Sequence, residues 1–208
     1  MTPKNMTEHI RVDRYGEFRL TDAVRPSPEL QVVPRQGYRI EHYQDARAGV
    51  VVPVLAAAVS GERLFDLFLE LLEPLGPVVD VVLETSHDSR GAGHQDLVRE
   101  HIDLPVLLSH FYDFEDLLLN DGCTGVAVVS AEEPIELQFD EHKVLIVYAR
   151  DLKPFERIFR QAGVPRDDRL KLITEGEHLH ATEQRHAEAF EQLGYRLCVA
   201  EPAGQVNW

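Results

Sequence analysis

The chain has 208 residues, of which 44% are hydrophobic and 27% charged, as is usual for a globular protein. A formal net charge of −15 argues against a nucleic-acid partner, because such proteins neutralise phosphates with Lys and Arg. No run of about 18 apolar residues occurs, so we expect no membrane span. The first residues lack the apolar stretch of a secretory signal. Cys123 and Cys198 are too few for a disulfide framework, which predicts free buried thiols and a cytoplasmic location.

The first 45 residues have the pattern of a β-rich N-terminal arm or subdomain. Apolar residues on either side of Tyr15-Gly16 predict a hairpin that turns there. A second hairpin is predicted to join residues 30–33 to residues 38–43 through a turn at 34–37.

Residues 46–84 predict a β-α-β unit. The apolar run 49–59 indicates a buried strand, in which Pro53 favours an edge position or a bulge. Ser60 is placed to cap the helix that follows, whose leucines and phenylalanines recur at helical spacing. Residues 78–83 then predict another strand. A polar loop at 85–97 separates it from a helical region at 97–120, which we expect Leu104-Pro105 to divide into two helices.

Residues 123–163 give the clearest pattern, a meander of three strands followed by a capped helix. The strands are predicted at 125–130, 135–139 and 144–149. In the second of them Ile135, Leu137 and Phe139 alternate with polar residues, so one face should be buried and the other wet. The polar residues 140–143 favour an ordinary solvated hairpin turn, with a charged functional loop as the alternative. Asp151 should cap the helix, and Gly163 should end it.

The remaining residues predict a short strand at 170–174, a helix from His180 or Thr182 to Gly194, a strand at 195–200 and a tail at 201–208. Together the elements indicate an α+β fold. We expect a mixed, largely antiparallel sheet with helices mainly on one face, and a β-rich N-terminal segment. The main domain is predicted at residues 46–200.

The loop after the strand at 78–83 carries the first candidate site. A His beside an Asp can act as a base, an Arg near glycine can hold an anion, and loops that follow strands often carry function. The alternative is a solvated surface loop. The candidate residues are Ser86, His87, Asp88, Arg90, His94 and Asp96.

His178 and His180 form a second, weaker candidate. On a strand the two imidazoles would share a face and could bind zinc. A polar entry into the next helix, with His180 near its cap, is the favoured alternative. No cofactor is predicted.

Phe111, Tyr112 and Phe114 lie in a dense aromatic and aliphatic stripe. Core packing explains such a stripe by default, and an exposed part of it would be a partner or dimer surface. The sequence thus favours a protein that acts by binding or self-association, its partner being a small molecule, a protein or a second copy of the chain. A hydrolase-type or metal-assisted enzyme that uses the loop 86–96 is the alternative.

Overall fold

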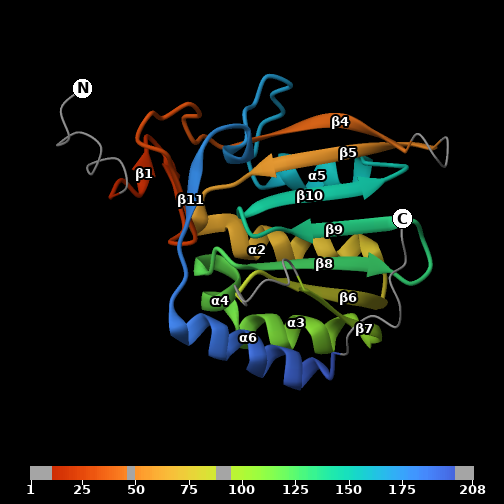
Figure 1. Ribbon diagram of the computed structural model, residues 1–208. Coiled ribbons are helices and arrows are strands. Elements are labelled where there is room, and N and C mark those ends of the chain that lie inside the picture. The colour runs from red at the N-terminus through yellow and green to blue at the C-terminus, as the bar shows by residue number, and fades with distance from the viewer. Residues whose placement is uncertain (1–10, 46–49, 88–94, 200–208) are drawn as a thin grey trace.

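The computed structural model describes residues 11–45, 50–87 and 95–199. The fold is α+β, as predicted, and is built on a seven-stranded sheet whose neighbouring strands all pair antiparallel. Figure 1 shows the sheet with its strands in spatial order. That order is β4 (Gly37–Asp45), β5 (Val50–Ala58), β10 (Val144–Ala149), β9 (Ile135–Phe139), β8 (Thr124–Ser130), β6 (Val78–Thr85) and β7 (Gln95–Asp103).

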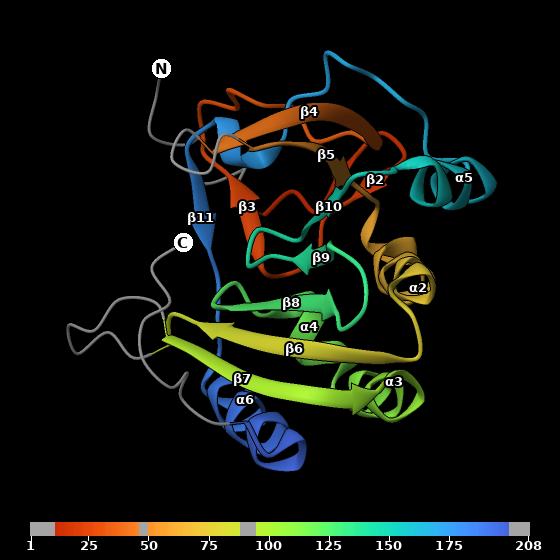
Figure 2. The same cartoon turned by 90° about the vertical axis from the view of Figure 1, so that its right-hand side faces the viewer.

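Helices cover one face of this sheet, as Figure 2 shows for α2, α3 and α5. The largest core cluster lies between the two layers: Phe68 of α2 packs against Phe111 of α3 and Phe139 of β9 at ring-centroid distances of 5.5 and 4.9 Å. The last helix, α6, packs on α3 and α4. The helices are α2 (Gly61–Leu72), α3 (Leu104–Asp113), α4 (Glu115–Asn120), α5 (Lys153–Gln161) and α6 (Gln184–Leu197), with 3-10 turns at η1 (Glu73–Leu75) and η2 (Ile173–Glu175). Among the described residues, no helix is long and apolar enough to cross a membrane.

Short strands and loops cover part of the opposite face. Strand β3 (Val24–Pro26) pairs antiparallel with β11 (His178–His180), and Figure 2 shows both on the side away from the helices. Leu170 and Leu172 form a small second core there with Ala56 and Val144. Strands β1 (Arg14–Tyr15) and β2 (Phe18–Arg19) form the hairpin predicted around Gly16.

The predicted meander lies in the middle of the sheet and divides the predicted β-α-β unit. Strands β5 and β6 flank β10, β9 and β8, so the connection through α2 crosses the whole meander. The alternation in β9 is confirmed, because Leu137 and Phe139 are buried. Pro53 does not lie on an edge strand, since β5 is paired on both sides. The ladder from β10 ends at Val54, however, so the missing N–H of Pro53 costs no hydrogen bond on that side.

Two predictions in the first half of the chain were wrong. Residues 97–103 belong to the edge strand β7, not to a helix; Ile102 is its only fully buried residue, so the strand shows little apolar alternation. Pro105 lies in the first turn of α3, directly after its first residue Leu104, where a missing N–H is tolerated. Residues 30–33 form no strand, and β4 pairs with β5, which makes it an edge strand of the main sheet.

The C-terminal part differs from prediction as well. Residues 170–174 form a loop and a 3-10 turn. Helix α6 continues through Gly194 to Leu197, so no strand forms at 195–199. Gly194 has no left-handed backbone; that conformation falls on Cys198, with φ of 53°, and the helix ends there. The tail 201–208 lies outside the described residues.

Candidate metal centre

Polar segments from distant parts of the sequence meet at one end of the sheet, on the left in Figure 1. They are the end of β6 with Ser86 and His87, the turn 121–123 before β8, the turn 140–143 between β9 and β10, strand β11 and the start of α6. At Gly122 the turn before β8 lies directly against the backbone of Ala23 and Ala181. The N–H of Gly122 donates to the Ala181 carbonyl at 2.8 Å, and a Cβ there would lie 2.4 Å from the Ala23 carbonyl oxygen. Only glycine fits this position.

His142, His178 and His180 form a cluster of imidazoles, which we call the three-histidine cluster. Their ring centroids are 4.7 to 5.1 Å apart, and one ring nitrogen from each lies within 4.8 Å of the others. Strand alternation places His178 and His180 on one face of β11, with Leu179 exposed on the other. His142 and His178 are half-buried and His180 is exposed.

Each imidazole of the three-histidine cluster is held by an oxygen acceptor. The Nδ1 of His142 lies 2.9 Å from Oδ2 of Asp140. The Nδ1 of His178 lies 2.8 Å from the Gly176 carbonyl oxygen, and that of His180 lies 2.5 Å from the Gly122 carbonyl oxygen. Because carbonyl oxygens only accept, these bonds place the proton on Nδ1 and leave the Nε2 lone pair free. The bond to Asp140 also raises the pKa of His142, against the effect of burial.

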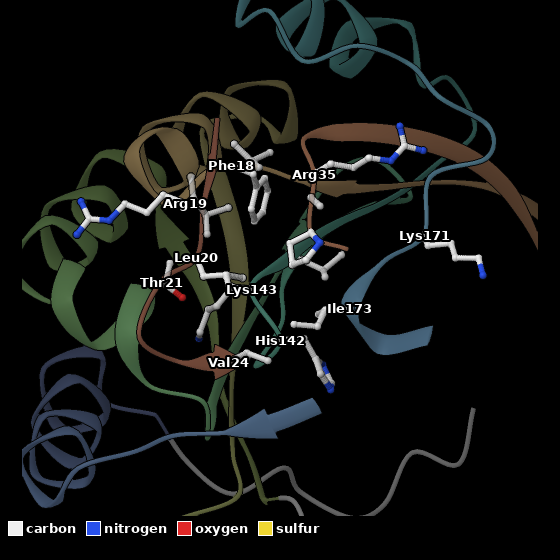
Figure 3. Close-up of a pocket in the computed structure, with 15 residues that line it drawn as sticks. Phe18, Arg19, Leu20, Thr21, Val24, Arg35, His142, Lys143, Lys171 and Ile173 are labelled. Atoms are coloured by element: carbon white, nitrogen blue, oxygen red, sulfur yellow. The ribbon is translucent and has the colours of Figure 1, made fainter. Parts of the chain in front are cut away.

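The turn that supplies His142 is not an ordinary solvated turn. Lys143 has a left-handed backbone with φ of 63°, and its side chain is buried. Its Nζ donates to the Thr124 carbonyl at 2.9 Å and lies 5.3 Å from the centroid of the Phe139 ring. Burial lowers the pKa of this ammonium group to about 8. Figure 3 shows the side chains of His142 and Lys143 leaving the turn in different directions.

The pocket in Figure 3 lies beside this turn, under the N-terminal hairpin. Its volume is about 30 Å³, and its wall is mostly apolar, with Phe18, Val24 and Ile173 among the lining residues. Such a volume admits little more than water. The pocket is therefore too small for an organic ligand, and the histidines remain the chemical feature of this region.

A second polar group surrounds Asp121, which is fully buried. One carboxylate oxygen, Oδ2, accepts a hydrogen bond from Oγ1 of Thr124 at 2.5 Å and lies 2.8 Å from Nε2 of His87. The other, Oδ1, lies 3.8 Å from Nδ1 of His186, which is buried on α6. Burial alone would raise the pKa of Asp121, but the contact with His87 and the hydrogen bonds from Thr124 and Thr182 outweigh it and lower the pKa to about 2. The carboxyl group is therefore ionised.

Cys123 adjoins this group. Its thiol, one ring nitrogen of His87 and one oxygen of Asp121 lie within 4.8 Å of one another. We call these three residues the Asp121 cluster. Burial raises the pKa of the Cys123 thiol, and hydrogen bonding with Ser86 opposes this in part. The thiol is thus not activated as a free nucleophile.

A cleft of about 680 Å³ opens between β6, β7 and α6, and its size is that of a small-molecule site. Thr85 and His87 contribute to its wall, and its apolar residues include Leu97, Phe190 and Val199. The ring of His87 packs edge-on against Phe190 at a centroid distance of 5.7 Å. The Asp121 cluster is therefore connected to this cleft through His87.

The structure places only some of the residues predicted in the loop 86–96 at the polar end of the sheet. Ser86 and His87 lie in the polar region, where Oγ of Ser86 donates to Oε2 of Glu141 at 3.2 Å. Asp96 is exposed on β7, away from β8 on the outer edge of the sheet. Asp88, Arg90 and His94 lie outside the described residues.

His178 and His180 lie on a strand rather than at a helix entry, so the favoured interpretation of that segment was wrong. Sequence reasoning favoured a solvated turn for His142 and gave no role to Asp121 or His186. Asp121 had the appearance of a turn residue before Gly122, and the histidine of the hairpin turn gave no periodic signal.

Of the aromatic stripe, Phe111 and Phe114 are buried in the main core and Tyr112 is exposed. Both cysteines are free, Cys123 half-buried and Cys198 exposed, so a buried position was wrong for Cys198. Comparison of the chain with protein-family models, curated proteins and solved structures finds no match.

Proposed function

We propose that this protein binds a divalent transition metal ion of the zinc type through Nε2 of His142, His178 and His180. The observation that supports this proposal is the hydrogen bonding of the three rings. Each Nδ1 is bonded to oxygen, so each Nε2 has the lone pair that a metal requires. Such outer bonds are typical of histidines that ligate metals, where they fix both the tautomer and the ring orientation.

The spacing of the rings agrees with one shared ion. Imidazoles bound to a tetrahedral zinc at about 2.0–2.1 Å have ring centroids roughly 5 Å apart. The centroids of the three-histidine cluster are 4.7 to 5.1 Å apart. One ring nitrogen from each histidine lies within 4.8 Å of the others, so rotations about the side-chain bonds would bring the rings to the nitrogen separation of roughly 3.3 Å in a closed site.

Three protein ligands leave one position of a tetrahedral ion open. Among the described residues, no other His, Cys, Asp or Glu joins this group. Zinc sites with three protein ligands and one open position are those that bind and polarise water or substrate, whereas structural zinc sites are closed by four. The half-exposed position of the cluster suits the entry of a small ligand. The site therefore fits metal-assisted chemistry better than a structural role, and self-association remains a prediction.

The proposal is tested by metal binding to the full chain stripped with a chelator. Bound zinc after equilibrium dialysis is measured by plasma mass spectrometry, and thermal unfolding is followed in the same samples. His142→Ala and His178→Ala should each remove one zinc equivalent relative to the unaltered chain. Free zinc at 100 times its Kd should stabilise the fold by about 2.7 kcal/mol, and each substitution should remove this contribution.

His42→Ala is the matched control, because His42 is exposed on β4, outside the cluster. It should leave both the zinc content and the melting temperature unchanged. Zinc binding that survives His142→Ala and His178→Ala in full would refute the proposal.

A further inference from the structure

We infer that His87, Asp121 and Cys123 form a second transition-metal site, with nitrogen, oxygen and sulfur ligands. This inference is independent of the first site, since it uses other residues and other observations. The three ligand atoms lie within 4.8 Å of one another, at the inner end of the turn that also supplies Gly122.

Unpartnered buried atoms point to a missing ligand at this position. Oδ1 of Asp121 and Nε2 of His87 are both buried and make no hydrogen bond. Asp121 has no exposed surface, so water does not solvate this carboxylate. Buried polar atoms without partners are rare, and each calls for an explanation such as a bound ion. Among the described residues, Asp121 forms no ion pair with Lys or Arg, and the nitrogens near its oxygens are those of the imidazoles of His87 and His186.

The contact between His87 and Asp121 supports two ligands rather than a hydrogen-bonded pair. Nε2 lies 2.8 Å from Oδ2, a hydrogen-bond distance, yet it forms no hydrogen bond of acceptable geometry. Two ligand atoms of one metal ion point at the ion and not at each other. They therefore lie close together without the alignment of a hydrogen bond. The other ring nitrogen, Nδ1, lies 2.7 Å from Oγ1 of Thr85, so the tautomer that leaves Nε2 free is available.

The remaining contacts hold the ligands in place. Thr124 donates to Oδ2 of Asp121 at 2.5 Å and leaves Oδ1 for the ion. The N–H of Ser86 donates to the Cys123 carbonyl at 3.0 Å, which joins the end of β6 to the segment that carries the thiol. A metal would also deprotonate Cys123, whose pKa burial raises in the free protein. Nitrogen, oxygen and thiolate together favour zinc, and cobalt(II) is its spectroscopic substitute.

The test is titration of the chelator-stripped full chain with cobalt(II), followed by visible and near-ultraviolet absorption. A thiolate bound to cobalt gives a near-ultraviolet charge-transfer band that imidazole and carboxylate ligands do not give. We expect two equivalents of cobalt, one of them with this band. Cys123→Ser should abolish the band and remove its equivalent, whereas His178→Ala should remove the other equivalent and keep the band.

Cys198→Ser is the matched control, because it replaces the other thiol, which is exposed at the end of α6. It should keep the band at full intensity. A chain that takes up no cobalt with thiolate character, or a band that disappears with Cys198→Ser instead, would overturn the inference. Circular dichroism of each variant establishes that the fold is intact. If only the proposed three-histidine site is wrong, the cobalt equivalent assigned to His178 is absent, while the equivalent with the thiolate band remains.

Discussion

The three-histidine cluster and the Asp121 cluster lie at the same end of the sheet but differ in the burial and the hydrogen bonding of their polar atoms. In the first, every Nδ1 has an oxygen partner and the rings are partly open to solvent. In the second, an ionised carboxylate is fully buried and faces nitrogens that make no hydrogen bond. The first cluster can therefore be altered at little cost to the fold, whereas the second is coupled to stability.

The two clusters are nevertheless connected through one turn. Gly122 offers its carbonyl to His180, and its neighbours Asp121 and Cys123 belong to the other cluster. A change in this backbone should therefore disturb both, while changes in the side chains should separate them.

The largest expected effect comes from Asp121→Ala. The substitution leaves the hydroxyl of Thr124 without its acceptor and removes the carboxylate that His87 and His186 contact in a buried position. Each buried polar group left without a partner costs about 1–3 kcal/mol, so we expect a total loss of about 3–5 kcal/mol in the free energy of unfolding. His178→Ala should cost less than about 0.5 kcal/mol without metal, because it removes a half-exposed ring. Denaturant unfolding with a chelator present compares the two. Equal losses of unfolding free energy in the two variants would contradict the view that only the Asp121 cluster is coupled to stability.

Gly122→Ala should be next. The new Cβ would lie 2.4 Å from the Ala23 carbonyl and 2.9 Å from the Ala181 carbonyl, and both are backbone atoms that cannot rotate away. We expect a loss of about 3 kcal/mol, together with weaker zinc binding, because the acceptor for His180 moves. Urea unfolding and equilibrium dialysis measure the two effects.

Gly194→Ala is the control for this substitution. Its Cβ would lie 3.2 Å from a methyl group of Val199 and 4.0 Å from one of Leu97, which are both side-chain atoms, and alanine favours the helix in which it lies. It should be neutral or stabilising. A Gly122→Ala variant as stable as Gly194→Ala would show that the turn can adjust.

The fold was predictable where local pattern and burial agree. The alternation of Leu137 and Phe139 indicated β9 because that strand has one buried face. Strand β7 escaped prediction because it lies at the edge of the sheet and buries only Ile102 fully. Gly194 has the residue type of a helix end, but tertiary packing continues α6 beyond it. Strand β7 is held by its pairing with the preceding strand β6, whereas the end of α6 is held by packing on elements distant in the sequence.

The candidate site was likewise predictable only where a local sequence pattern indicated it. The spacing of His178 and His180 indicated a shared face on a strand, and His87 followed a predicted strand. Nothing local distinguishes His142 from a surface turn residue, or Asp121 from a helix stop. Their roles depend on β11 crossing the end of the sheet and on α6 placing His186 beside Asp121, which are contacts between remote segments.

The smallest effect should come from Asp140→Asn, which tests whether orientation of the rings matters at the first site. Oδ1 of Asp140 accepts the N–H of Val144 at 2.9 Å, and asparagine can preserve this bond with its amide oxygen. The amide nitrogen then faces Nδ1 of His142, so the ring loses its acceptor while every ligand remains.

We expect zinc affinity to fall by about 10-fold or more, with little change in the stability of the metal-free chain. Isothermal titration with zinc measures this. Asp151→Asn is the control, since Asp151 lies outside the cluster and accepts the N–H of Lys153, the first residue of α5, at 3.0 Å. Unchanged affinity in Asp140→Asn would mean that the histidines bind metal without help from their partners. The hydrogen bonds that distinguish the three-histidine cluster from the Asp121 cluster would then contribute nothing to metal binding.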